Sequence, residues 1–270
     1  MRDSVRGAAA IIRRDLLIAS TQPFGLIARL VGSIVGVAGF YYVSQFVDPH
    51  HALQTGAKHG SYFSYVSVNL IFMMLQASAL QSFAQSLRTD QILGTLEPIL
   101  ATPIAPGAYV IASGLFPLMM SSLQIVLTLA AASLLFGLDV GSTNLATLCA
   151  FAALSTATMA GLGMFAAAAV IALKQMPPSG YLVGGAGSLL AGTLFPVRLL
   201  PAPLQAISWC LPLTHSLAGL RGAVDGSPLR ALSADAAWLS IAVLVLVPSA
   251  FVALRRTIEM GRRDGTLSQY

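Results

Sequence analysis

The residues of this sequence that could do chemistry are few and scattered. Three of its four histidines, His50, His51 and His59, follow Asp48 within one short polar stretch. Histidine and aspartate together can bind a transition metal, but ligand sets normally recur at a regular spacing. The spacing here is irregular, so a hydrated loop is favoured over a metal site, and we assign no metal to the chain.

Catalytic patterns are also missing from the sequence. It contains no G-x-x-x-x-G-K-[ST] phosphate-binding loop. An intramembrane enzyme would need a nucleophile with its base, or a metal cluster, and neither pattern is found. We therefore expect no enzyme activity and no cofactor on this chain. If ATP drives the protein, ATP and Mg²⁺ must bind to a partner chain.

One charged stretch interrupts the apolar sequence: "RTDQILGTLEPILATPIAPGAY", residues 88–109. Leucines and isoleucines from Ile92 to Leu100 recur at helical spacing, with Arg88, Asp90 and Glu97 on other faces. This pattern predicts a short amphipathic helix over residues 88–103. From the residues alone, it is either an ordinary helix lying on the bilayer surface or an element that docks on another protein.

The elements that would position these residues are membrane spans. Hydrophobic residues make up 56% of the chain and charged residues only 9%, and runs of roughly 18 apolar residues are long enough to cross a bilayer as helices. The fold class is therefore all-α integral membrane protein, with residues 1–270 forming a single domain. Six transmembrane helices are predicted at Leu26–Val47, Tyr62–Leu87, Tyr109–Phe136, Leu145–Leu173, Tyr181–Phe195 and Ala236–Leu254.

The distribution of Lys and Arg predicts the orientation of the spans. Six crossings place both termini on one side, and the N-terminal arginines, Arg88, Lys174 and residues 255–263 then fall on that same side. Cytoplasmic flanks collect positive charge, so we expect cytoplasmic N- and C-termini in a multi-pass protein of the cell (inner) membrane. The net charge of +5 then reflects topology and attraction to membrane lipid, and no nucleic acid is needed to explain it.

Two further segments flank the spans. Residues 1–24 place Val5, Ala9, Ile12 and Leu16 on one apolar stripe, which predicts a helix lying in the inner interface. Residues 196–235 include the apolar stretch "VRLLPAPLQAISWCLP", which is bracketed by prolines and too short to cross. They predict an outer re-entrant segment before the last helix.

Polar amides and small residues mark possible contacts inside the bilayer. The amides are either hydrogen-bonding links between helices or the lining of a substrate path; they are Asn69, Gln76, Gln81 and Gln124. Small residues recur every fourth position on the first and fifth predicted spans, as packing faces or as a dimer or pore feature. These are Gly32 and Gly36, and Gly184, Ser188 and Gly192.

Three fragments resemble one family. "GTLEPILATPI" (residues 94–104), "LFPVRLLPAPLQAISWCLPLTHSLAGLRGA" (residues 194–223) and "RRDGTLSQY" at the end are similar, in order and topological side, to membrane subunits of ATP-binding-cassette (ABC) exporters, the type-2 exporter permease family. The resemblance implies a subunit used in pairs, whose first cytoplasmic loop is a coupling helix seated on a separate P-loop ATPase present in two copies. It also implies that the first and fifth helices border the two-fold axis.

Carried over residue by residue, the resemblance assigns ATPase coupling to one segment. Its core is Gly94, Thr95, Leu96 and Glu97, with Arg88 at its start. Pro98 departs from the family pattern, and because proline disfavours the helical conformation of the preceding residue, two short turns meeting at Glu97 are expected.

The function expected from the sequence is that of a permease subunit of an ATP-driven ABC exporter. The scarcity of buried charge favours an amphipathic, lipid or glycan cargo over a small ion. The alternative is an ion-coupled transporter or channel without an ATPase partner, which would be expected to carry ionisable residues in mid-span or two related halves. The sequence displays essentially no acid in mid-span and no internal repeat.

Overall fold

Long apolar runs become long helices here, because a helix satisfies its own backbone groups where no water is present. A computed structural model describes residues 2–21, 23–44, 62–102, 104–138, 141–173 and 187–263, and these residues contain no strand. Five helices are long and apolar enough to cross a membrane. They are α2 (Pro23–Ser44), α4 (Tyr62–Ile92), α6 (Pro106–Phe136), α7 (Leu145–Leu173) and α12 (Ser233–Arg263).

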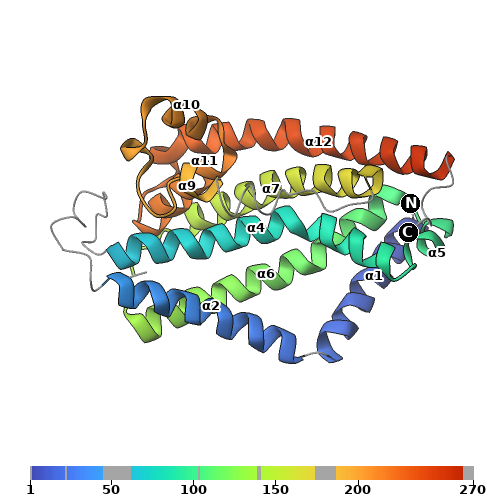
Figure 1. Cartoon of the computed structure of the whole chain (residues 1–270), viewed down its shortest axis with the longest axis horizontal. Coiled ribbons are helices and arrows are strands. Elements are labelled where there is room, and N and C mark those ends of the chain that lie inside the picture. The colour runs from blue at the N-terminus through green and yellow to red at the C-terminus, as the bar shows by residue number, and fades with distance from the viewer. Residues whose placement is uncertain are drawn as a thin grey trace.

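These helices confirm the all-α class and five of the predicted spans. The remaining one, Tyr181–Phe195, falls partly outside the described residues, which include only positions 187–195 of it. There a short helix, α9 (Ser188–Leu190), is followed by a turn. In Figure 1, α7 ends at one end of the bundle and α9 lies at the opposite end. The sixth crossing stays a prediction.

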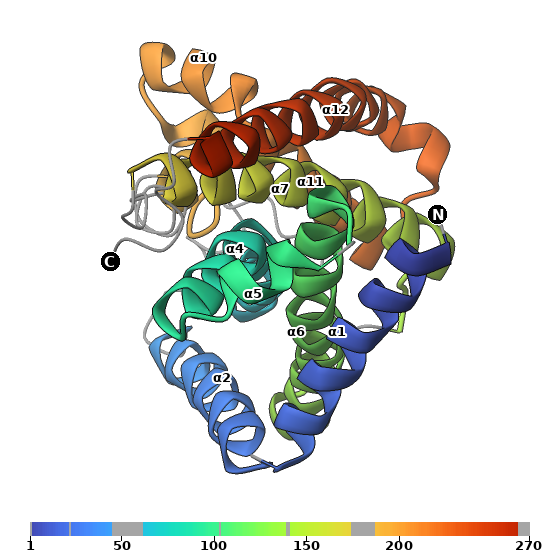
Figure 2. The same cartoon turned by 90° about the vertical axis from the view of Figure 1, so that its right-hand side faces the viewer.

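The long helices form layers (Figures 1 and 2). From one side to the other these layers are α12, then α7, then α4 with α6, then α2 with α1 (Arg2–Thr21). One end of the bundle carries the start of α1, the end of α12 and the short helix α5 (Leu96–Ala101); we name it the α5 end. The opposite end carries α10 (Ala202–Cys210) and is named the α10 end.

The core of the bundle lies where α7 packs against α4 and α12. About two thirds of the apolar stretch of α4 is buried, against about a tenth of that of α2. Close approach of α4 and α7 depends on Gly163, since a Cβ atom there would lie 2.5 Å from the carbonyl oxygen of Leu80. Small residues allow this backbone proximity, and the chain thereby gains a well-packed centre with a loosely attached α2.

Both predicted flanking segments are helical. The N-terminal prediction of residues 1–24 corresponds to α1, which buries Ile11 and leaves Leu16, Leu17 and Ile18 exposed. The outer segment 196–235 reaches the start of α12 at Ser233, and the helices before α12 in this segment are too short to cross a membrane. Their positions relative to a bilayer remain predictions. They are η2 (Val197–Leu199), α10, α11 (Pro212–Val224) and η3 (Leu229–Leu232).

Two predicted boundaries were wrong. The second span was expected to end at Leu87, but α4 continues to Ile92, so Arg88 belongs to the end of α4. The single helix expected over residues 88–103 is instead the end of α4, a turn, and the six-residue α5. The helical conformation is interrupted at Gly94, whose φ of 68° lies in the left-handed region that ends helices and favours glycine.

Candidate functional site

The turn between α4 and α5 is held to the end of α4 by backbone bonds. The amide of Thr95 donates to the carbonyl of Asp90 over 2.9 Å, and that of Gly94 donates to the carbonyl of Gln91 over 3.0 Å. These bonds occupy carbonyls that a helix end would otherwise leave unpaired. The direction of α5 is therefore fixed by α4 itself.

Asp90 is the centre of this site, because three elements bond to its carboxylate. Arg14 of α1 donates from Nη1 to Oδ1 over 3.2 Å and from Nη2 to Oδ2 over 3.5 Å. Tyr109 of α6 donates its hydroxyl to Oδ2 over 2.6 Å, and Thr95 donates Oγ1 to Oδ1 over 3.0 Å. We name these four residues the Asp90 corner; it joins α1, α4, α6 and the α5 turn.

Burial makes these contacts strong. Asp90 is 4% exposed and Tyr109 is fully buried, whereas the Arg14 side chain is 36% exposed. Hydrogen bonds to a buried charge are about twice as strong as neutral ones. On the outer side of the corner, Arg14 also pairs with Asp15 over 2.9 Å, and burial raises the pKa of the Asp15 carboxyl, an effect that Arg14 partly offsets.

The arrangement at the corner suits mechanical linkage rather than chemical reaction. Its carboxylate is surrounded by donors, and no nucleophile with a base lies beside it. Among the described residues, no group of three or more His, Cys, Asp or Glu could hold a metal ion. The structure does not describe His50, His51 and His59. The hydrated loop expected around them therefore stays a prediction.

The predicted coupling residues gather beside the Asp90 corner. Gly94 makes the break, Thr95 bonds to Asp90, and Leu96 is buried at the start of α5 with 2% exposure. Arg88 is half-buried on the last turns of α4. Glu97 is the second residue of α5, and its side chain lies outside the described part.

Pro98 does not break the chain, contrary to the expectation of two turns meeting at Glu97. It is the third residue of α5, and the backbone stays helical from Leu96 to Ala101. The first four amides of a helix have no partner within it, so a proline in the first turn removes no helical hydrogen bond. The helix break lies four residues before Pro98, at Gly94.

Asn69 takes part in a second polar cluster, at the α10 end. Its Nδ2 donates to the carbonyl of Thr193 over 2.9 Å, and the nearby Tyr65 donates its hydroxyl to the carbonyl of Gly192, also over 2.9 Å. Arg221 of α11 donates from Nη1 to the Tyr65 hydroxyl over 2.8 Å. These bonds join α4 to the turn after α9.

The other amides have different surroundings. Gln76 is fully buried in α4, and neither of its side-chain polar atoms has a hydrogen-bond partner. Gln81, also on α4, is exposed. Gln124 of α6 donates to the backbone carbonyl of Arg29 over 3.3 Å. The structure does not bring these residues together along one path.

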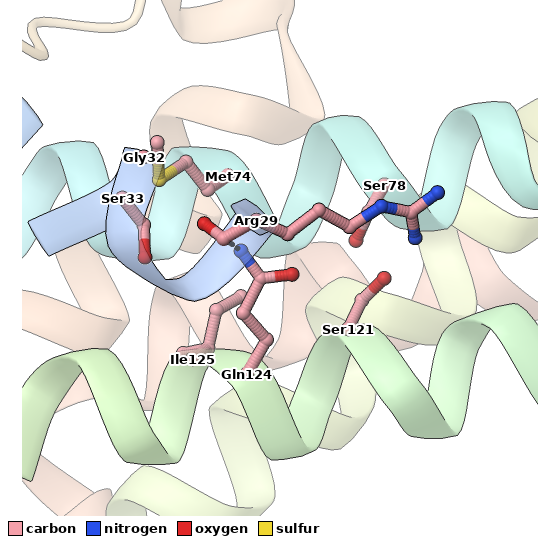
Figure 3. A pocket seen from close by; sticks show the side chains of 8 residues that line it. All are labelled: Arg29, Gly32, Ser33, Met74, Ser78, Ser121, Gln124 and Ile125. Carbon is pink, nitrogen blue, oxygen red and sulfur yellow. Dashed lines mark hydrogen bonds between the residues drawn. The ribbon is translucent and has the colours of Figure 1, made fainter. Parts of the chain in front are cut away.

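A pocket opens between α2, α4 and α6, close to Gln124. Its volume is ≈ 370 Å³, and Figure 3 shows the Arg29 side chain extending past Gln124 toward Ser78 and Ser121. Beside it, the hydroxyls of Ser33 and Thr128 lie 2.8 Å apart and tie α2 to α6. Other residues that line the pocket include Gly32, Met74 and Ile125.

The two predicted stripes of small residues differ. At Gly32 and Gly36 a Cβ atom would meet no atom within 4 Å, so neither glycine packs closely against another of the described helices. Gly184 lies outside the described residues. Gly192 was expected on a helix with Ser188, but α9 ends at Leu190 and Gly192 occupies a turn with a φ of 77°.

Sequence reasoning missed the central residue of the site. It placed Asp90 on a polar face, and it did not pair Arg14 or Tyr109 with anything. One signal was available: Asp90 follows Phe83 and Leu87 at helical spacing, on a face that is buried.

Comparison with known proteins covers most of the chain. Residues 7–224 match a family model described as ABC-2 type transporter. No curated protein matches the sequence. The match includes all four residues of the Asp90 corner, the α5 turn and the cluster at the α10 end.

Proposed function

The chain belongs to the ABC-2 type transporter family, and from this premise we propose that it is the permease subunit of an ATP-driven exporter. The family is a membrane component of transporters, and the apolar helices of this chain are those of a multi-pass membrane protein. ATP and Mg²⁺ would bind to a separate P-loop ATPase, since the sequence has no phosphate-binding loop.

The observation that carries the proposal is the Asp90 corner beneath α5. A helix of six residues gains little stability from its own hydrogen bonds, yet α5 is fixed to the bundle by buried Leu96 and by the bonds from Thr95 to Asp90. An element that is short, projecting and firmly anchored suits a docking role. We assign the ATPase contact to this turn, with Arg88, Gly94, Thr95, Leu96 and Glu97 as its residues.

This assignment orients the protein. The α5 end would face the cytoplasm of the cell (inner) membrane, together with both termini. Arg255 and Arg256 are exposed in the last part of α12, which ends at the α5 end of the bundle. This agrees with the positive charge of cytoplasmic flanks. The α10 end, with its short helices, would face outward.

Transport would follow from movement of the α5 turn. Nucleotide-driven closure of two ATPase subunits would displace α5, and the Asp90 corner would pass that displacement to α1, α4 and α6 together, because all of them bond to one carboxylate. A ligand shifts such an equilibrium only through different contacts in its two states. The cargo would be amphipathic, a lipid or a glycan, and it would move between two copies of the chain.

The exposed glycines of α2 support pairing of two copies. At Gly32 and Gly36 a Cβ atom would meet no atom of the described residues within 4 Å, and only about a tenth of the apolar stretch of α2 is buried. Small residues let helices from different subunits approach closely. In this proposal α2 contributes to the dimer contact or the pore.

The test is co-purification of an ATPase with the tagged chain from its own host, in mild detergent. We expect a P-loop ATPase with the wild type and its depletion with Glu97→Arg. The matched control is Glu259→Arg, which reverses an exposed acid on α12 toward the same end of the bundle and should leave the ATPase bound. Absence of any ATPase from the folded, dimeric wild type would refute the proposal.

A further inference from the structure

The pocket between α2, α4 and α6 contains an uncompensated positive charge. Among the described residues, Arg29 is the only charged one that lines it, and α2 and α6 contain no other Asp, Glu, Lys or Arg. The one acid of α4 is Asp90, which already accepts bonds from Arg14, Tyr109 and Thr95. Among the salt bridges of the described residues, none involves Arg29.

The position of Arg29 along α2 places this charge near the edge of the bilayer core. The apolar stretch of α2 begins at Ile27, so Arg29 lies two residues, or about 3 Å of helix rise, inside it. Phosphates of lipid headgroups lie at the edge of the hydrocarbon region. A charge at this level is costly unless it finds a counter-ion, and guanidinium groups bind phosphate oxygens in a bidentate manner.

Several other polar groups of the pocket can accept hydrogen bonds. Ser78 donates its hydroxyl to the carbonyl of Leu75, and Ser121 donates to that of Pro117. Each hydroxyl has one hydrogen, so both oxygens can only accept a further bond. Gln124 donates one of its two amide hydrogens to the carbonyl of Arg29, which leaves the second hydrogen as a donor and Oε1 as an acceptor. The pocket thus offers one cation beside a group of acceptors.

We propose that this pocket binds the headgroup of an anionic phospholipid that carries hydroxyls, as phosphatidylglycerol does. Arg29 takes the phosphate, and the oxygens of Ser78, Ser121 and Gln124 accept bonds from the headgroup hydroxyls. A choline headgroup supplies a second cation and no hydroxyl, so it fits poorly. The inference does not depend on export, because it concerns binding by the chain itself.

The test is titration of the full-length chain in mild detergent, with bound lipid measured by native mass spectrometry. Phosphatidylglycerol should bind at least about tenfold more tightly than phosphatidylcholine, since tenfold corresponds to one modest charge-assisted contact. Arg29→Gln should remove this preference and Arg29→Lys should retain most of it. Gln124 donates to the backbone carbonyl of Arg29, and neither variant changes that carbonyl, so this bond is kept.

A second pair of variants separates the pocket from the rest of α2. A Cβ atom at Gly32 or at Gly39 would meet nothing within 4 Å, so leucine should be tolerated at both positions. Only Gly32 lines the pocket. Gly32→Leu should lower phosphatidylglycerol binding by about tenfold, and Gly39→Leu should leave it unchanged.

Three results would overturn the proposal. One is equal binding of the two lipids by the wild type, and another is unchanged phosphatidylglycerol binding by folded Arg29→Gln. The third concerns the source of the phosphate: soluble glycerol phosphate is added as a competitor. Displacement of the lipid by glycerol phosphate at equal concentration would show a site for the free anion and would refute the assignment to a lipid.

Discussion

Replacing Asp90 with asparagine should release α1 from the rest of the bundle. The two side chains have nearly the same shape, so the change removes the charge and one acceptor without leaving a cavity. Each carboxylate oxygen of Asp90 now accepts from two donors: Arg14 and Thr95 at Oδ1, and Tyr109 and Arg14 at Oδ2. Asparagine keeps one oxygen and places an NH₂ group against the donors of the other.

The size of the effect follows from those contacts. Two donors lose their acceptor, and hydrogen bonds to charged groups contribute about 1.5–3 kcal/mol each. Because the Arg14 side chain is 36% exposed, water can replace part of its loss, and the lower figure applies. The total is about 3 kcal/mol, which corresponds to more than about a 100-fold increase in local opening of α1.

Hydrogen–deuterium exchange with peptide-level mass spectrometry measures this opening directly. Peptides from α1 should exchange about 100-fold faster in Asp90→Asn, and peptides from α7, which has no bond to the corner, should be unchanged. Asp15→Asn is the matched control, because Asp15 bonds to Arg14 but not to α4. It should change α1 exchange by less than about threefold.

An α1 exchange rate in Asp90→Asn within about threefold of the wild-type rate would refute this prediction. It would mean that α1 is held by its apolar contacts alone. Combining Asp90→Asn with Arg14→Gln gives a further check, since residues that share one bond should show less than the sum of their separate effects. Additive effects would show that the two side chains do not interact in solution.

Other substitutions have equally defined outcomes. Gly192→Ala should destabilise the protein by about 1–2 kcal/mol because of its φ of 77°, whereas Gly39→Ala in open space should be neutral or stabilising; thermal unfolding in detergent compares them. Gly163→Ala should lower the melting temperature more than either, since its Cβ would lie 2.5 Å from a backbone oxygen of α4. Ser33→Ala removes the bond to Thr128 and should increase deuterium uptake of α2 alone.

The sequence predicted the spans well because hydrophobicity determines them. Every described span begins or ends within a few residues of a predicted boundary, apart from the ends of α4 and α12, which continue to Ile92 and Arg263. At α4 the prediction stopped at the first charge, Arg88. The helix continues because Asp90 is buried and paired, and a pairing across 76 positions of chain leaves no local pattern to detect.

Turn chemistry explains the errors near α5 and α9. Proline at position 98 was taken to break the helix, but the effect of a proline depends on its position within the helix, and the first turn tolerates it. Gly192 was placed on a helical stripe because of its four-residue spacing. Its positive φ shows that this glycine is required by the backbone conformation of a turn, which spacing alone does not reveal.

The bond between Asn69 and Thr193 has a consequence for how the chain is made. Its partners are separated by 124 positions, so at a synthesis rate of about 5–20 residues per second the amide of Asn69 waits about 6–25 seconds for its acceptor. During that time α4 contains a polar group that lipid cannot satisfy. We therefore expect the insertion machinery to keep α4 away from lipid until Thr193 has been made. The helix α2, which has few contacts within the chain, can enter the bilayer earlier.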